Sequence, residues 1–217
     1  MRAVIFANGS LGDPEHYRGL WRPDDLIVVA DGGARNALAA GLTPQVVVGD
    51  LDSLPDALRR ELETRGCQFM RYPARKDQTD LELALREAAR RGAQELLILA
   101  ATEGRTDQSL ANILLLARSE FAGLKVKLVG ETWEALLVRD RAQIIGQVGD
   151  TLSLIPLSPR VTGIYTGGLE YPLEGGTLEF GSTRGISNVF TASLAEVRIG
   201  SGALLAVRLA PGALKGK

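Results

Sequence analysis

Two aspartates, Asp50 and Asp52, follow a run of three valines in the segment QVVVGDLDSLPD. In an extended chain alternate residues point to the same side, so these two carboxylates would point together. Like charges held close to each other repel unless a cation lies between them. The pair therefore predicts a cation-binding site at the end of a buried strand.

Acidic residues follow three other apolar runs in the same way. They are Asp31 after LIVVA, Asp77 and Asp80 after CQFMRYP, and Asp107 after LLILAA. Because ligands bind at the carboxyl ends of the strands in a parallel α/β sheet, we expect all six acids at one edge of such a sheet. Each acid alone has an ordinary explanation in a turn or a helix start, and Thr79 with Glu82 has the spacing of a capping box. Six together favour a hard dication bound through oxygen.

The donor set indicates which metal and which ligand to expect. The one histidine, His16, and the one cysteine, Cys67, lie in a loop and in a strand-like run, and we expect neither to bind a metal. An all-carboxylate site favours Mg²⁺, or Mn²⁺ as a substitute. Gly32 and Gly33 open a helical pattern where backbone N–H groups approach phosphate, and Arg105 has a planar group suited to phosphate oxygens. We therefore expect a nucleotide with magnesium, although the chain has neither a GxxxxGK[ST] nor a GxGxxG motif.

The composition excludes several other classes of function. The chain has 217 residues, of which 45% are hydrophobic and 24% charged, with a formal net charge of −1. This balance argues against broad electrostatic binding of nucleic acid or of an anionic membrane. No run approaches the roughly 20 apolar residues of a membrane span, and the segment MRAVIFANGS predicts a first strand rather than a signal peptide. A single cysteine excludes an internal disulfide, and we expect a cytoplasmic protein with a buried structural thiol.

The elements that must position the acids follow two patterns, and the first is an alternation of strands and helices. Apolar runs of strand length occupy 3–7, 26–30, 46–48 and 95–101. Helical patterns occupy 33–41, 55–66, 79–92 and 109–123, and each ends at a glycine, Gly41, Gly66, Gly92 and Gly123. Apolar strands separated by helices predict an α/β fold, with a mostly parallel sheet covered by helices.

The second pattern begins near residue 130. Short, partly alternating runs broken by Gly, Pro and Ser occupy 151–157, 161–173, 177–182, 193–200 and 203–209. They predict a smaller antiparallel β-sandwich domain. We expect an α/β nucleotide- and magnesium-binding catalytic domain over 1–132 and the β-sandwich over 133–217.

Several segments, in this order, resemble the thiamine pyrophosphokinase (thiamine diphosphokinase) family, and its bacterial type most closely. They are ADGGARNAL, PQVVVGDLDSL, KDQTDLELAL and GRTDQSLANILLL in the first region, and GDTLSLIPLS, VTGIYTGGLEYPL and TLEFGSTRGISNVF in the second. The resemblance implies transfer of the terminal pyrophosphoryl group of ATP to the hydroxyethyl oxygen of thiamine, giving AMP and thiamine diphosphate. It also implies a homodimer, with thiamine in a cleft between the β domain and the partner's α/β domain.

The resemblance implies a role for each residue that matches a family motif. The catalytic residues would be Asp50, Asp52, Asp77, Asp80, Arg105 and Asp107, with magnesium at Asp50, Asp52 and Asp80. The nucleotide would lie against Asp31, Gly32, Gly33 and Arg105. Thiamine would contact Ser187 and Asn188, with Tyr171 or Trp133 as the aromatic neighbour. Either Asp77 or Asp80 is a candidate to take the hydroxyl proton.

One departure and two alternatives remain open at this point. In ATEGRTD, Glu103 occupies a position where the family commonly has glycine, which adds charge and bulk to the loop. A pyrophosphokinase acting on a hydroxymethylpterin would have a similar first region, and the segment STRGISN favours thiamine instead. A non-catalytic protein that binds a magnesium nucleotide would not need every acid together with Arg105.

Overall fold

A computed structural model of the chain describes residues 1–210. The chain divides into two compact units: Met1–Leu116 with Gly123–Glu131, and Ala117–Ala122 with the chain from Thr132 onward. Residues 211–217 of the predicted β domain lie outside the described residues. None of the helices in the described part is long and apolar enough to cross a membrane.

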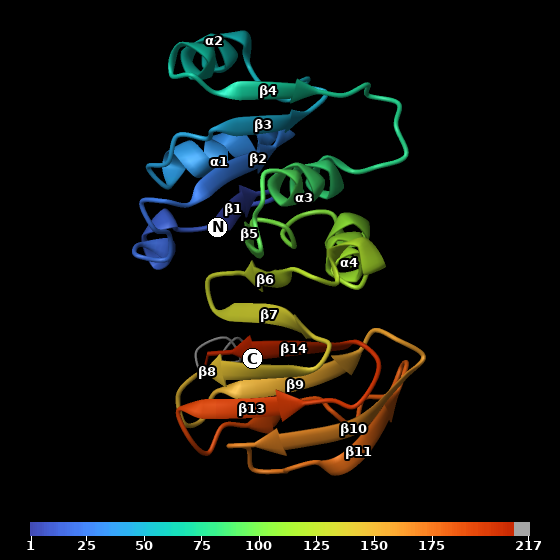
Figure 1. Ribbon diagram of the computed structural model, residues 1–217. Helices are drawn as coiled ribbons and strands as arrows, with labels where there is room; N and C mark the ends of the chain where they lie inside the picture. Colours follow the sequence, from blue (N-terminus) through green and yellow to red (C-terminus); the bar gives the residue numbers. More distant parts are fainter. Residues whose placement is uncertain (211–217) are drawn as a thin grey trace. The chain divides into compact units, whose positions relative to one another are not determined.

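The first unit contains a parallel sheet with the strand order β6-β5-β1-β2-β3-β4 (Figure 1). The strands are β1 (Arg2–Phe6), β2 (Leu26–Ala30), β3 (Val46–Gly49), β4 (Gln68–Arg71), β5 (Glu95–Leu99) and β6 (Lys125–Val129). Neighbouring strands pair in parallel throughout. The predicted parallel sheet is confirmed, with β6 as a strand that the sequence analysis did not single out.

Short helices connect these strands, and their ends largely follow the predicted glycines. The helices are α1 (Ala34–Ala39), α2 (Asp56–Thr64), α3 (Asp80–Arg90) and α4 (Thr106–Leu115), with the 3-10 helices η1 (Pro14–Tyr17), η2 (Asp31–Gly33) and η3 (Ser119–Phe121). Gly41, Gly66 and Gly92 have φ angles of 76°, 81° and 91°, the left-handed conformation that ends helices.

The predicted continuation of the fourth helix to Gly123 is wrong, because α4 ends at Leu115. Arg139 Nη2 donates a hydrogen bond of 2.7 Å to the carbonyl of Ala117, which a continuing helix would offer to the N–H of Phe121. That N–H instead bonds to the carbonyl of Arg118 at 3.2 Å and forms the short η3. A tertiary contact therefore replaces the last helical turns.

The first unit is held together by apolar side chains that alternate along the strands. Val4, Phe6, Val29 and Val47 belong to one buried cluster that also includes residues of α1 and α2. The intervening strand residues face the other side of the sheet, where α3 contacts β1, β2 and β3. Cys67 is 8% exposed in the first cluster, and burial raises the pKa of its thiol to about 11. The predicted buried thiol is confirmed.

The second unit is a sandwich of two antiparallel sheets. Their strand orders are β12-β9-β14-β7 and β11-β10-β13-β8. The strands are β7 (Trp133–Val138), β8 (Arg141–Ile145), β9 (Thr151–Pro156), β10 (Arg160–Gly167), β11 (Glu174–Glu179), β12 (Asn188–Val189), β13 (Leu194–Arg198) and β14 (Leu204–Leu209). Side chains of both sheets share one buried cluster, which includes Leu152 and Leu204 from one sheet and Ile164 and Val197 from the other. The predicted fold class is confirmed.

A buried ion pair joins the first strand to the chain segment before β2. Arg2 donates to both carboxylate oxygens of Asp25, from Nε at 2.8 Å and from Nη2 at 2.6 Å. The N–H of Arg22 donates to the same carboxylate at 2.6 Å. Burial alone would raise the pKa of Asp25, but these hydrogen bonds outweigh it and lower the pKa. Asp25 therefore stabilises the fold as a carboxylate.

A second buried carboxylate, Glu87 on α3, predicts an acid-sensitive contribution to stability. Hydrogen bonds from Arg90 lower the pKa of Glu87, burial opposes them in part, and Arg91 lowers the pKa further. Because the folded-state pKa lies below the ordinary value of 4.5, this stabilisation is complete above that value. It is lost as the pH falls through the folded-state pKa.

We therefore expect Glu87→Gln to lower the free energy of unfolding at pH 7, and the difference from wild type to shrink below pH 4.5. Urea unfolding at a series of pH values measures this difference. Glu63→Gln on α2 is the matched control, because Glu63 is exposed and its nearest cation, Arg59, is 3.8 Å away. A difference for Glu87→Gln that stays constant with pH would contradict the assignment.

Candidate active site

Three carboxylates meet at the carboxyl ends of β2 and β3. Asp31, Asp50 and Asp52 each offer an oxygen atom, and these atoms all lie within 4.8 Å of one another. β2 and β3 are neighbours in the sheet, which brings the residues that follow them together. Asp31 is only 5% exposed, whereas Asp50 is half-buried and Asp52 is exposed. Three of the six acids predicted at one sheet edge therefore come together, with Asp31 as the most buried of them.

The route by which Asp50 and Asp52 come together differs from the prediction. The expected extended chain is wrong, because β3 ends at Gly49 and Leu51 has a φ of 69° in the left-handed region. The N–H of Asp52 donates to Asp50 Oδ1 at 3.2 Å and closes a tight turn between the two acids. Asp31 also has a positive φ, 45°, so strained backbone gathers at this edge of the sheet.

Gly49 lets Asp31 approach the end of β3. A Cβ atom on Gly49 would lie 2.9 Å from the Cβ of Asp31 and 3.3 Å from the Cγ of Asp80. Asp31 and Asp80 therefore both lie against Gly49, and Asp80 is near enough to Asp31 and Asp50 to be affected by their charges. A larger residue at position 49 would push both acids away.

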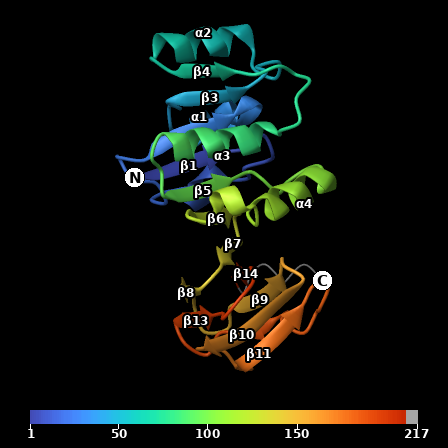
Figure 2. The ribbon, with the colours of Figure 1, turned by 45° about the vertical axis from the view of Figure 1, so that its right-hand side comes forward.

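Asp80 is paired with a cation of the chain itself. Lys76 Nζ lies 3.0 Å from Asp80 Oδ1 and also donates to the carbonyl of Pro73. Burial raises the pKa of Asp80, Lys76 lowers it, and the nearby charges of Asp31 and Asp50 raise it again. Lys76 belongs to the segment between β4 and α3, and Figures 1 and 2 show that this segment forms a wide loop.

The cluster of the three carboxylates has the properties of a site for a hard cation. Asp31 Oδ1 is buried and accepts no hydrogen bond from any residue that the structure describes. A buried carboxylate oxygen without a donor is costly unless a cation is bound there. Asp31, Asp50 and Asp52 supply oxygen atoms alone, which suits Mg²⁺. Asp31, expected at the nucleotide, thus lies with two of the expected metal ligands.

A cavity of about 410 Å³ opens beside Asp31 and Asp80. It lies among the ends of β1, β2 and β5 and the starts of α3 and α4. Asn8 and Gly9, which follow β1, line it as well, although the sequence analysis did not single them out. Their place after an apolar run, like that of the acids, is the signal that would have found them.

Gly32 and Gly33 fit closely against the end of β1. A Cβ on Gly32 would lie 2.3 Å from Asn8 Oδ1, and one on Gly33 would lie 2.2 Å from the carbonyl oxygen of Phe6. Both glycines are buried in η2, which leads into α1 as the sequence predicted. They allow the start of the helix to lie directly against the end of β1, although neither glycine is among the described residues that line the cavity.

The remaining predicted residues of the first unit lie at the rim of the cavity or outside it. Arg105 and Glu103 line the cavity, and Arg105 forms an exposed ion pair with Asp107, at 2.5 Å between Nη2 and Oδ2. Asp77 is exposed, and it is not among the described residues that line the cavity. The structure therefore brings Asp80 and Arg105 to the cavity and leaves Asp77 outside it.

In the second unit, the predicted thiamine-binding residues form a local cluster. Asn188 Oδ1 accepts from the N–H of Tyr171 at 3.0 Å, and Asn188 Nδ2 donates to the carbonyl of Tyr171 at 2.7 Å. Asn188 thus fixes the backbone of Tyr171, a residue that is 66% exposed. Ser187 has a φ of 62°, and its N–H donates to Ser153 Oγ. The three predicted residues come together, with one N–H of the Asn188 amide free of these contacts.

Comparison of the sequence with models of known protein families identifies the family of this chain. The model described as thiamin pyrophosphokinase, catalytic domain, matches residues 17–128, and the model described as thiamin pyrophosphokinase, vitamin B1 binding domain, matches residues 140–204. The chain belongs to the thiamin pyrophosphokinase family. The family predicted from the sequence motifs is confirmed.

Similar members of the thiamin pyrophosphokinase family come from bacteria. Thiamine pyrophosphokinase of Bacillus subtilis (strain 168) is 31% identical over 185 residues, which cover 84% of this chain and 86% of that protein. A crystal structure of thiamine pyrophosphokinase from Bacillus subtilis has a TM-score of 0.86 at 28% identity and covers 97% of this chain and 99% of its own. One from Geobacillus thermodenitrificans has a TM-score of 0.83 at 27% identity, with coverages of 97% and 98%.

Gly9 provides a test of the cavity in this family member. Its N–H donates to the carbonyl of Ala100 at 2.9 Å, and a Cβ would lie 2.5 Å from that oxygen and 2.7 Å from the carbonyl oxygen of Glu103. We expect Gly9→Ala to push the loops after β1 and β5 apart and to lower kcat/KM for ATP about tenfold. Gly123→Ala is the control, since no described atom lies within 4 Å of its added Cβ. Equal kcat/KM values for the two variants would show that this loop contact does not shape the nucleotide site.

Proposed function

We propose that the chain transfers the pyrophosphoryl group of ATP to the hydroxyethyl oxygen of thiamine, giving AMP and thiamine diphosphate. The observation that carries this proposal is the group of Asp31, Asp50 and Asp52 at the edge of a cavity of about 410 Å³. Such a group suits a magnesium nucleotide, and the match to a vitamin B1 binding domain favours thiamine over a hydroxymethylpterin as acceptor.

Transfer of this group depends on positioning and on neutralising negative charge. Mg²⁺ held by Asp31, Asp50 and Asp52 would supply a positive charge for the phosphate oxygens. Arg105 would leave its exposed pair with Asp107 and bind phosphate oxygens, which its planar group fits. Gly32 and Gly33 bring the start of α1 close to the cavity, where it can face the nucleotide.

The proton of the hydroxyl group needs an acceptor near the cavity. Between the two candidates, we favour Asp80, because it lines the cavity and burial raises its pKa, whereas Asp77 is exposed outside it. The bond from the thiamine oxygen to the β-phosphorus forms, and the bond from that phosphorus to the α,β-bridging oxygen breaks. AMP leaves with the electron pair, and Asp80 takes the proton.

Binding of thiamine is proposed for the second unit. Ser187 and Asn188 would contact the pyrimidine, and Tyr171, held by Asn188, would offer its exposed ring for stacking. We also propose a cytoplasmic homodimer in which thiamine binds between this unit and the first unit of the partner. Sedimentation velocity of the whole chain at micromolar concentration tests the dimer, and a monomer at all concentrations would refute it.

The reaction is tested by AMP release from ATP and magnesium with thiamine as acceptor, and by mass spectrometry of the product. AMP together with thiamine diphosphate is the expected result. A hydroxymethylpterin serves as the control acceptor. Product formation only with the pterin would overturn the thiamine assignment, and binding of ATP without AMP release with either acceptor would overturn catalysis.

A further inference from the structure

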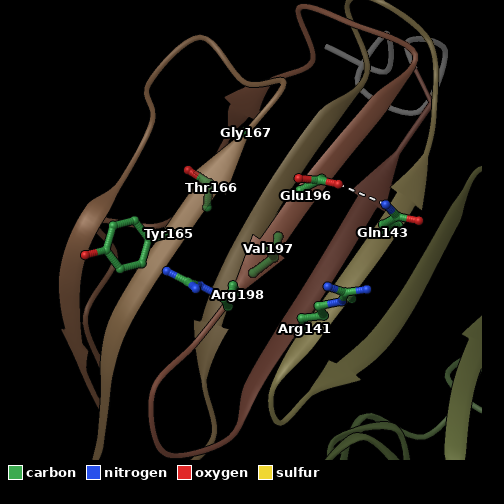
Figure 3. A pocket seen from close by; sticks show the side chains of 9 residues that line it. Arg141, Gln143, Tyr165, Thr166, Gly167, Glu196, Val197 and Arg198 are labelled. Atoms are coloured by element: carbon green, nitrogen blue, oxygen red, sulfur yellow. Dashed lines mark hydrogen bonds between the residues drawn. The ribbon is translucent and has the colours of Figure 1, made fainter.

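The outer face of one sheet in the second unit contains a groove of about 380 Å³ (Figure 3). Strands β8, β10 and β13 form its floor, and we call it the arginine groove after Arg141 and Arg198. Both arginines and Tyr165 are exposed, whereas Val197, which precedes Arg198 in β13, belongs to the sandwich core. The groove therefore lies on the surface that faces away from the core.

Two rows of side chains cross this face, and they differ in charge. In one row Gln143 and Glu196 are cross-strand partners, and Gln143 Nε2 donates to Glu196 Oε1 at 2.9 Å. In the next row Arg141 and Arg198 are cross-strand partners. Side chains paired in this way begin only about 5 Å apart, and like charges so placed destabilise a sheet.

Neither arginine of the second row has a carboxylate partner within the described part of the chain. The acid nearest in the strand pattern, Glu196, is bound to Gln143 instead (Figure 3). Arg160 on the same sheet, by contrast, is paired with Glu179 at 2.8 Å. The two arginines of this row therefore have no ion pair within the described residues like the one that neutralises Arg160.

Tyr165 orients one of the two guanidinium groups. It is the cross-strand partner of Arg198 on the other side, and the guanidinium carbon lies 4.7 Å from the centroid of the tyrosine ring. Figure 3 shows Arg198 reaching toward this ring, with Arg141 on the adjacent strand. Stacking uses the face of a guanidinium and leaves its N–H groups, which lie in the plane, available to an anion.

We propose that the arginine groove binds the pyrophosphoryl group of a small molecule. Two adjacent guanidinium groups can each form paired hydrogen bonds to phosphate oxygens, and a pyrophosphoryl group offers two neighbouring phosphates to a row of two cations. Glu196 lines the groove beside the arginine row, and its negative charge favours a short anion over a long polyanion. This site belongs to the second unit, whereas the carboxylates belong to the first, and it goes beyond the proposed function.

Inorganic pyrophosphate is the first probe, used in isothermal titration of the whole chain with EDTA present to remove divalent cations. We expect a binding event that the double variant Arg141→Gln/Arg198→Gln weakens about tenfold or more, since hydrogen bonds between charged groups are individually strong. Arg160→Gln is the matched control, because it removes a positive charge from the same sheet outside the groove. Tyr165→Leu should weaken binding less than the double variant.

Equal affinity in the wild type, the double variant and Arg160→Gln would overturn the proposal, as would the absence of any binding without divalent cations. The source of the pyrophosphoryl group is then distinguished by competition with ADP and with thiamine diphosphate. Equal competition by both would show that the groove contacts only the two phosphates of each molecule. A preference for one of them would identify a contact to the rest of that molecule. AMP release by the double variant, measured separately, is expected to stay at the wild-type level.

Discussion

Replacement of Asp52 by asparagine is expected to lower turnover about 100-fold or more while leaving the fold intact. Asp52 is exposed, and its Oδ1 accepts a hydrogen bond of 3.1 Å from the hydroxyl of Ser53, which the oxygen of an amide of the same shape can accept as well. The substitution does, however, remove one of the three negative charges that can hold a cation at this site. AMP release at saturating ATP and thiamine measures the effect.

The matched control is Asp56→Asn, at the start of α2. Asp56 is exposed, and it pairs with Arg59 at 3.3 Å rather than with the three carboxylates. It should keep wild-type turnover. Titration with Mn²⁺ gives a second readout, in which Asp52→Asn should bind the ion more weakly and Asp56→Asn should not. Wild-type activity and Mn²⁺ affinity in Asp52→Asn would remove the metal role.

Replacement of Asp25 by alanine is expected to reduce the free energy of unfolding by about 3–5 kcal/mol, the usual effect of removing one partner of a buried ion pair. The side chains of Asp25 and Arg2 are 1% and 14% exposed, so the guanidinium would lose its carboxylate in a place that water hardly reaches. The N–H of Arg22 would lose its acceptor as well. Urea unfolding with an unchanged m-value measures the loss.

Asp24→Ala is the control for this prediction, because Asp24 is the exposed neighbour in the same turn. It should change the free energy of unfolding by less than about 0.5 kcal/mol. The pKa of Asp25 is lowered in the folded chain, so its contribution is present above its ordinary pKa of 3.8 and is lost as the pH falls through the folded-state value. Similar midpoints for Asp24→Ala and Asp25→Ala at pH 7 would contradict the ion-pair assignment.

Features set by neighbouring residues were predictable from the sequence. The valine run 46–48 is a buried strand, and Gly41, Gly66 and Gly92 end helices, because side-chain periodicity and backbone freedom act locally. α4 was predicted too long because the contact that ends it comes from Arg139, far along the chain. Local patterns do not carry such information.

The sequence predicted that acidic residues would gather at one sheet edge, but it did not predict which of them would form the group. Asp31 lies with Asp50 and Asp52 because β2 and β3 are adjacent in the sheet, an order that periodicity does not specify. The turn between the two acids requires a left-handed conformation at Leu51. Glycine or asparagine at this position would have signalled such a turn, but leucine does not. Likewise, Asn188 reaches the backbone of Tyr171 because the chain folds back across the sandwich.

Because the thiol of Cys67 is buried, the chain should be almost unreactive toward reagents that modify thiolates. With a pKa of about 11, roughly one thiol in a thousand is ionised at pH 8, and little of its surface meets solvent. A cysteine introduced at an exposed position of either unit would therefore react alone, without removal of the native one. Pairs of such cysteines, one in each unit, would carry spectroscopic labels and measure the distance between the units as ATP and thiamine bind.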